Sequence, residues 1–293
     1  MEVGYVLCGE PGAAEAQILA RSYPVRLWDR SRHSPTTLAA GGVAAVTNGA
    51  TLATACDVIF VRLPHPSDVR AALSGADGLM GGLSRGKIVV DRTPGGPDQT
   101  RAMASELSAV GAALIDAPAS SVWDPGDASK PGIVLSGPLD ACETVRPLLE
   151  KISPHLHYCG QAGNSQVLDL MIKTMSACTQ LATLEIAAMG RKFGLGTETM
   201  AEVISKGSGR NRTSQILLPA IAAGTAVSNF PMPEMLEALT LSTGMGASCG
   251  VPMFTAHIAR GLLQAGVHRF GEHAVMDDTI ELIEGMADTE LRG

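Results

Sequence analysis

The sequence has few aromatic residues and few charged ones for its length. Of its 293 residues, 3% are aromatic and 17% are charged, and the net charge is −7. This negative balance excludes the basic surface expected of a protein that binds nucleic acid or an anionic membrane. Glycine, by contrast, is abundant, with 33 residues, and this favours a β/α architecture with many tight turns.

Motifs for metal binding, export and membrane insertion are also missing. The six cysteines are scattered without C-x-x-C or Cys/His metal spacing, which predicts free thiols in a reducing cytoplasm and no metal site. The chain starts M-E-V-G-Y-V-L, a strand-like run rather than a signal peptide. The longest uncharged run, residues 213–233, is interrupted by proline and glycine, which disfavours a membrane span. We therefore expect a cytoplasmic protein with a small-molecule ligand, no nucleic acid and no membrane partner.

The first 29 residues have the layout of a dinucleotide-binding unit. A buried-type strand at 3–8 leads through a glycine turn into a helix at 13–21, and a second strand ends at Asp29. Gly9 allows the backbone to approach a pyrophosphate, Gly12 allows close helix–strand packing, and the helix N-terminus favours the anion. Leu7 occupies the place of the first glycine in G-x-G-x-x-G, so an ordinary strand–helix turn remains an alternative.

The cofactor would be NAD or NADP. Asp29 could accept hydrogen bonds from a ribose 2′-hydroxyl and favours NAD, whereas Arg30, Ser31 and Arg32 could hold a 2′-phosphate and favour NADP. The sequence leaves this choice open.

Further strands at 57–64, 87–91, 113–118 and 132–137 alternate with helices. Ligands of open α/β sheets bind at the carboxyl ends of the strands, which places the candidate residues in one crevice. The cofactor-binding candidates are Leu7, Gly9, Glu10, Pro11, Gly12, Asp29, Arg30, Ser31, Leu63, Pro64 and Thr93.

A long helix is predicted over residues 164–193, with Gly194 as its stop. It is mostly apolar, but Gln166, Asp169 and Lys173 recur at steps of three and four and share one face. Only helical patterns follow, with breaks at glycine and proline. The predicted fold is an α/β Rossmann-type N-terminal domain (residues 1–162) followed by an all-α C-terminal domain (163–293), joined by the long interdomain helix.

The chain resembles the β-hydroxyacid dehydrogenases, which include 3-hydroxyisobutyrate dehydrogenase and belong to the 6-phosphogluconate dehydrogenase superfamily. The resemblance spans nearly the whole chain and rests on Val3-Gly4-Tyr5-Val6, Gly9, Gly12, Leu63-Pro64, Asp91-x-Thr93, Asp116-Ala117-Pro118-Ala119-Ser120, Gly163, Gln166 and Gly250-Val251-Pro252. It implies hydride transfer between a nicotinamide and a small hydroxy acid or its carbonyl form. It also implies a substrate site between the domains, a homodimer formed through the helical domain, and substrate-binding roles for Ser120, Ser121 and Val122. Ser121 and Val122 replace the family's glycines.

The chain departs from the family at the catalytic helix. The family's lysine position holds Asp169, and the second asparagine, one turn later, holds Lys173. In one interpretation Lys173 takes over as acid/base at a hydroxyl, and Asp169 pairs with it at i,i+4. Imine reductases often have aspartate at the equivalent position, so an NADPH-dependent imine reductase is an alternative. A catalytically altered nucleotide-binding or scaffold protein is the third.

Overall fold

The computed structural model of the chain describes residues 1–31, 43–119, 132–225 and 227–292. The chain divides into two compact units, residues 1–169 and 170–293. Within the described ranges, no helix combines the length and the apolar character needed to cross a membrane.

The first unit is built on a parallel sheet of six strands in the order β3-β2-β1-β4-β5-β6. Its strands are β1 (Val3–Leu7), β2 (Val25–Asp29), β3 (Val43–Ala45), β4 (Val58–Arg62), β5 (Ile88–Asp91) and β6 (Ala113–Asp116). The central strands are buried on both faces, and this explains their continuous apolar runs. The strand order reverses between β1 and β4, so the crevice of the sheet lies at their carboxyl ends.

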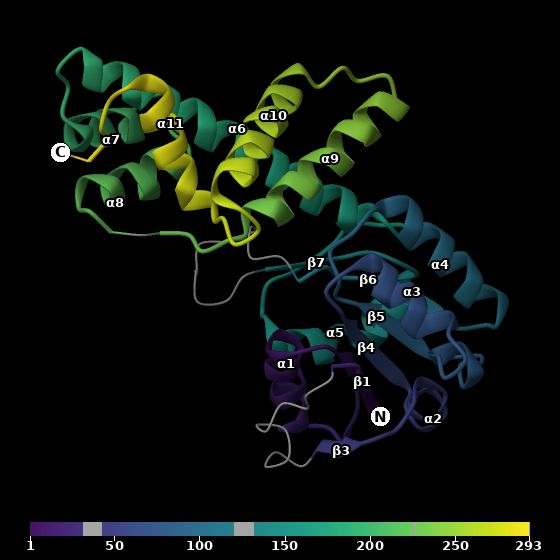
Figure 1. Cartoon of the computed structure of the whole chain (residues 1–293). Coiled ribbons are helices and arrows are strands. Elements are labelled where there is room, and N and C mark those ends of the chain that lie inside the picture. Colours follow the sequence, from purple (N-terminus) through teal and green to yellow (C-terminus); the bar gives the residue numbers. More distant parts are fainter. Residues whose placement is uncertain (32–42, 120–131, 226, 293) are drawn as a thin grey trace. The chain divides into compact units, whose positions relative to one another are not determined.

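Helices cover both faces of this sheet, as Figure 1 shows. One core forms where α1 (Glu10–Ala20) and α5 (Leu139–Ile152) pack on the odd-numbered residues of β1. The opposite core is formed by α2 (Gly49–Ala55), α3 (Pro66–Ser74), η1 (Leu79–Gly81) and α4 (Pro97–Ala109). A doubly wound α/β unit results, as the sequence predicted.

The strand predicted at 132–137 is confirmed as β7 (Ile133–Leu135), but it does not extend the large sheet by a ladder. It pairs in parallel with β8 (Leu156–Tyr158) in a separate two-stranded sheet. An isolated bridge between Asp116 and Ser136 brings this small sheet against the end of β6.

The predicted long helix is α6 (Asn164–Lys192), and the two units divide within it. Phe193 and Gly194 follow it, and Gly194 has the positive φ of 87° expected at a helix stop. The second unit continues with helical segments alone. They are α7 (Thr197–Lys206), η2 (Thr213–Leu217), α8 (Leu218–Ala222), α9 (Met232–Ser248), α10 (Phe254–Phe270), η3 (Met276–Asp278) and α11 (Thr279–Ala287). The predicted fold class, a Rossmann-type unit followed by an all-α unit, is confirmed.

Candidate functional site at the carboxyl edge of the sheet

The glycine turn connects β1 to α1. Gly9 has φ 87°, a backbone conformation that L side chains rarely adopt. A Cβ on Gly12 would lie 2.7 Å from the Cβ of Leu7, so helix and strand approach each other as closely as glycine permits. Leu7 ends β1 with its side chain fully buried, and Glu10 and Pro11 begin α1. The turn is therefore formed without the first glycine of the motif.

The end of β2 presents a carboxylate. Oδ1 of Asp29 accepts a hydrogen bond from the backbone N–H of Ser31 over 2.8 Å. Oδ2 is buried and has no hydrogen-bond partner among the described residues. The guanidinium of Arg30 lies 4.8 Å from the ring centroid of Trp28, on which it stacks. The aspartate thus keeps one acceptor for a ligand.

The ends of β4 and β5 are joined by Thr93. Its Oγ1 accepts a hydrogen bond from the N–H of Leu63 at 3.1 Å, and its own N–H donates to Oδ1 of Asp91 at 2.9 Å. The side-chain amide of Gln166, at the start of α6, donates to the Thr93 carbonyl at 2.9 Å and accepts from Gly95 N–H at 2.8 Å. The predicted residues Leu63 and Thr93 are therefore brought together.

Asp91 is fully buried beside this junction. Burial raises its pKa to about 7, although the hydrogen bonds from Thr93 oppose the shift. A carboxyl group with this pKa gains or loses its proton near neutrality, unlike an exposed aspartate.

A hydrogen-bonded network around Asp116 fixes the start of α6. Oδ1 of Asp116 accepts from Oγ of Ser136 at 2.8 Å and from Gly163 N–H at 2.9 Å. The hydroxyl of Ser165 donates to the Asp116 carboxylate and lies 2.8 Å from its backbone carbonyl. The sequence suggested Ser165 only as a candidate N-cap of the long helix and did not place Ser136 or Ser165 beside Asp116, because Asp116 is 20 and 49 residues away from them.

A buried charge cluster, consisting of Tyr5, Glu15, Arg62 and Arg92, was also missed. Oε1 of Glu15 accepts from Arg62 Nη1 at 2.7 Å and from Arg92 Nη2 at 3.0 Å. Oε2 accepts from the Tyr5 hydroxyl at 2.7 Å and from Arg92 Nε at 3.2 Å. Burial is the largest single influence on the pKa of Glu15 and would raise it, but the charges of Arg92 and Arg62 and the hydrogen bonds from Arg92 and Tyr5 together hold the pKa below its ordinary value. The only signal in the sequence was an arginine at the end of each of two buried strands.

The charge cluster links α1 to the strand ends. Arg92 donates from Nη1 to the carbonyl of Ala117 at 2.5 Å, directly after β6. Burial raises the pKa of Tyr5 well above its ordinary value, and the charge of Glu15 adds to this, so the phenol stays neutral and donates. One carboxylate thus connects the helix that follows the glycine turn with the ends of β4, β5 and β6.

The two acid/base candidates lie on α6. Asp169 and Lys173 are buried, with 1% and 6% exposure, and the four-residue spacing places them on one face of the helix. Nζ of Lys173 is 5.9 Å from the ring centroid of Phe230. Pro64, the last predicted strand-end residue, is exposed. The predicted substrate residues Ser120, Ser121 and Val122 lie outside the described residues.

Comparison with known families agrees with this architecture. Residues 3–160 match the family described as the NAD binding domain of 6-phosphogluconate dehydrogenase. Residues 163–283 match the NAD-binding domain of NADP-dependent 3-hydroxyisobutyrate dehydrogenase. The chain belongs to the β-hydroxyacid dehydrogenases. It is an oxidoreductase of this family, and its cofactor is NAD or NADP.

Individual members of the β-hydroxyacid dehydrogenase family are distant relatives. The 2-(hydroxymethyl)glutarate dehydrogenase of Eubacterium barkeri is 25% identical over 268 residues, which cover 91% of this chain and 89% of the relative. The 3-hydroxyisobutyrate dehydrogenase of Mycobacterium tuberculosis, solved with L-serine, matches with a TM-score of 0.81 at 19% identity, over 98% of this chain and 99% of that one. An imine reductase of Bacillus cereus matches with a TM-score of 0.62 at 17% identity, over 99% and 100% of the two chains. At these identities the structural matches show the shared fold.

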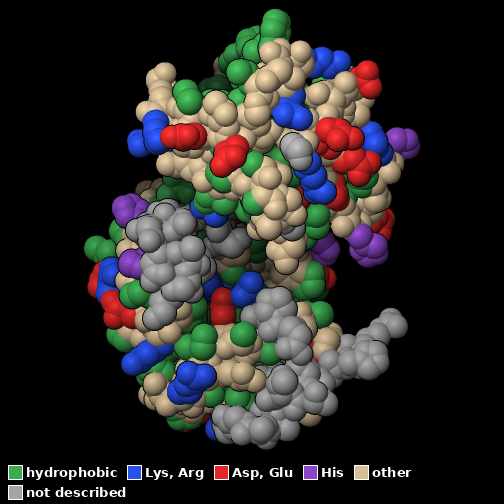
Figure 2. Space-filling view, turned by 90° about the vertical axis from the view of Figure 1, so that its left-hand side faces the viewer, with side chains coloured by type: hydrophobic (Ala, Val, Ile, Leu, Met, Phe, Trp, Pro, Cys, Tyr) green, Lys and Arg blue, Asp and Glu red, His purple; other side chains and the backbone are tan. Residues whose placement is uncertain are grey.

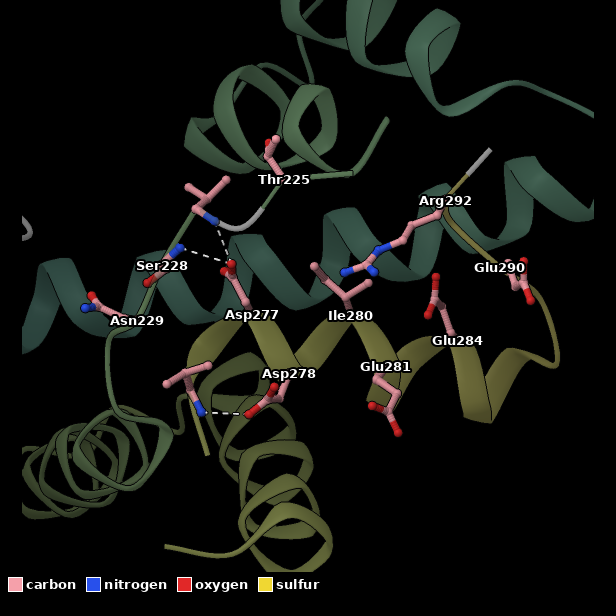
Figure 3. A pocket seen from close by; sticks show the side chains of 12 residues that line it. Thr225, Ser228, Asn229, Asp277, Asp278, Ile280, Glu281, Glu284, Glu290 and Arg292 are labelled. Atoms are coloured by element: carbon pink, nitrogen blue, oxygen red, sulfur yellow. Dashed lines mark hydrogen bonds between the residues drawn. The ribbon is translucent and has the colours of Figure 1, made fainter. Parts of the chain in front are cut away.

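A pocket of about 880 Å³ opens in the helical unit of this β-hydroxyacid dehydrogenase (Figure 3). Its acidic side chains serve the local structure. Oδ2 of Asp277 accepts from the N–H groups of Val227 and Ser228, Oδ2 of Asp278 accepts from Val275 N–H, and Glu284 accepts from Leu291 N–H. Among the described residues, no group of three or more His, Cys, Asp or Glu side chains could hold a metal ion. The carboxyl edge therefore remains the candidate site.

Proposed function

We propose that this oxidoreductase transfers a hydride between a nicotinamide and a small β-hydroxy acid or its carbonyl form. The observation that carries this proposal is Lys173, an ammonium group buried to 6% exposure on α6, one turn after Asp169. The named relatives, 2-(hydroxymethyl)glutarate dehydrogenase and 3-hydroxyisobutyrate dehydrogenase, act on small acids that carry a hydroxyl group. They support this substrate class.

Lys173 is the proposed acid/base. In the direction of reduction its ammonium donates a proton to the substrate oxygen as negative charge develops there, and in oxidation the neutral amine accepts the hydroxyl proton. The nicotinamide, when bound, supplies or accepts the hydride. Asp169 is the proposed positioning residue, because it lies one turn before Lys173 on the same face of α6. Keeping two charges on a buried helix face costs free energy, and catalysis explains that cost.

Binding of the substrate acid is proposed for Ser120, Ser121 and Val122. They follow Ala119, whose N–H donates to the Arg92 carbonyl at 2.8 Å beside the carboxyl edge. Serine hydroxyl groups and backbone N–H groups can hold a carboxylate.

We further propose that the cofactor is NAD. The buried Oδ2 of Asp29 has no hydrogen-bond partner among the described residues and suits a ribose hydroxyl donor. A 2′-phosphate would place negative charge against this carboxylate, which is unfavourable. The guanidinium of Arg30 is stacked on Trp28. The prediction is that wild-type protein binds NAD⁺ at least tenfold more tightly than NADP⁺, and that Asp29→Ala reduces this ratio.

A homodimer through the helical unit is also proposed. An exposed apolar stripe runs along α6 and continues to the residue after it, since Met171, Met175, Ile186, Met189 and Phe193 are 53–83% exposed. Exposed apolar surface on this scale is typical of a protein–protein interface. The mass in solution, measured by light scattering, tests the proposal.

The remaining expectations concern other partners and the compartment. Among the described residues on the face that Figure 2 shows, basic side chains are interspersed with acidic ones. The proposal that the protein has no nucleic-acid partner is supported by its net charge of −7. All six cysteines are free, which supports a reducing, cytoplasmic compartment.

The enzymatic proposal is tested with a panel of β-hydroxy acids and cyclic imines, each with NAD(H) and NADP(H). We expect turnover of a β-hydroxy acid. Lys173→Ala should lower kcat about 10²- to 10⁴-fold, the usual contribution of a general acid or base. The matched control is Lys192→Ala, which removes an exposed lysine from the same helix and should leave kcat unchanged. Wild-type turnover by Lys173→Ala would overturn the role of Lys173, and turnover of imines alone would favour the imine reductase.

A further inference from the structure

Arg62 occupies an unusual place for a charged residue. It ends β4 directly beside Leu7, its registered neighbour at the end of β1, where the glycine turn begins. Its side chain is 28% exposed at the edge of the sheet, and its Nη1 is bonded to Glu15. A cation is therefore held next to the turn.

The charge cluster holds this cation firmly. The Glu15 carboxylate accepts four hydrogen bonds, one from Tyr5, one from Arg62 and two from Arg92, and Arg92 is itself 3% exposed. A carboxylate has about four acceptor sites, so Glu15 is saturated. Burying these charges costs free energy, and apolar side chains would pack well at a strand end. We therefore expect the charge cluster to serve a function.

The glycine turn differs from the usual anion-binding motif. The N-terminus of α1, where a dinucleotide pyrophosphate would lie, favours an anion, but Leu7 has replaced the first glycine of the motif. A guanidinium beside Leu7 adds positive charge at this place, and its planar fork of donors matches phosphate oxygens.

We propose that Arg62, held in place by Glu15, binds phosphate oxygens of the dinucleotide cofactor beside the Gly9 turn. The proposal rests on the proposed function, since it assumes that the cofactor occupies this edge. Tyr5 and Arg92 are positioning residues that fix the carboxylate holding Arg62. The cation thus supplies part of the anion recognition that the altered glycine turn lacks.

The test compares ADP with adenosine, which differ only in their phosphates, by calorimetry and ligand-observed NMR. Arg62→Met should weaken ADP and NAD⁺ binding roughly tenfold or more, the factor for losing one charge-assisted hydrogen bond. Adenosine binding should not change. Arg62→Lys keeps the charge and should restore part of the ADP affinity. Arg26→Met is the matched control, since Arg26 lies within β2 of the same sheet and pairs with Glu2 at 3.4 Å.

The possible results separate the two proposals. If wild type binds NAD⁺ and Arg62→Met binds ADP as tightly as wild type, only the role of Arg62 is overturned. If Arg62→Met weakens adenosine as much as ADP, the residue is structural and the proposal also fails. If wild-type protein binds neither NAD⁺ nor NADP⁺, the proposed function is overturned, and the role of Arg62 in cofactor binding is overturned as well.

Discussion

Asp91 gives the first unit a stability that depends on pH in an unusual direction. Its pKa is about 7 in the folded protein, raised by burial, and about 3.9 in an unfolded chain. Between these values the folded state holds a proton that the unfolded state has lost. The contribution of Asp91 to the free energy of unfolding is therefore greatest below about pH 4. It falls as the pH rises and is lost above about pH 7. Three pKa units correspond to about 4 kcal/mol at most.

Asp91→Asn removes this dependence with little change of shape. Its amide oxygen can still accept the hydrogen bond from Thr93 N–H, which is 2.9 Å long in the wild type, but it cannot ionise. The free energy of unfolding of the variant should therefore increase relative to wild type between pH 5 and pH 8, by a few kcal/mol. Because both tryptophans fall within residues 1–169, urea unfolding followed by tryptophan fluorescence reports on this unit.

Asp98→Asn serves as the control, since Asp98 lies in the first turn of the neighbouring helix α4 and its side chain is 92% exposed. It should shift stability by the same small amount at both pH values. If Asp91→Asn also changes the free energy of unfolding equally at pH 5 and pH 8, the carboxyl group does not titrate in this window and the reasoning is refuted.

Three further predictions concern the thiols, the Gln166 amide and the glycine turn. Iodoacetamide should modify exposed Cys249 first and leave Cys56 and Cys142 unmodified until the protein unfolds. The reason is that burial raises the pKa of Cys56 to about 11 and that of Cys142 to about 12. Peptide mass spectrometry measures which thiols are modified. Gln166→Ala leaves the Thr93 carbonyl and Gly95 N–H without partners and should cost about 1–3 kcal/mol in urea unfolding, whereas the exposed Gln161→Ala should be neutral. Gly12→Ala drives a Cβ to 2.7 Å from Leu7 Cβ and should destabilise the protein by about 1–3 kcal/mol in a thermal scan; an unchanged melting temperature would contradict the close packing.

The sequence predicted the large elements well, because their periodicity is local. The long helix predicted over residues 164–193 differs from α6 (Asn164–Lys192) by one residue at its end. The strands that were missed are β3 (Val43–Ala45) and β8 (Leu156–Tyr158), each three residues long. Runs this short contain too few side chains to show a period, and only pairing with a neighbour makes them strands.

The candidate site was predicted less completely than the fold. The positions of Gly9, Asp29 and Thr93 could be inferred, because each follows a recognisable strand and parallel strands end at one edge. The charge cluster could not, because Arg62 and Arg92 meet Glu15 across 47 and 77 residues. A strand pattern shows which positions end at the edge but does not show which side chains meet there.

Asp91 and Arg92 are adjacent in the sequence but lie on opposite faces of the sheet. Successive residues of a strand point to opposite faces of the sheet. Asp91 continues the face of Val89, which packs with α4, and Arg92 continues the face of Val90, which packs with α1. The pKa of Asp91 is therefore set mainly by burial, and the charge of Arg92 affects it less than the hydrogen bonds from Thr93 do. Asp91→Asn should consequently change the pH dependence of stability without changing ADP affinity, while Arg62→Met should do the reverse. A variant at either position that moved both quantities would show that the two faces are coupled through the backbone between residues 91 and 92.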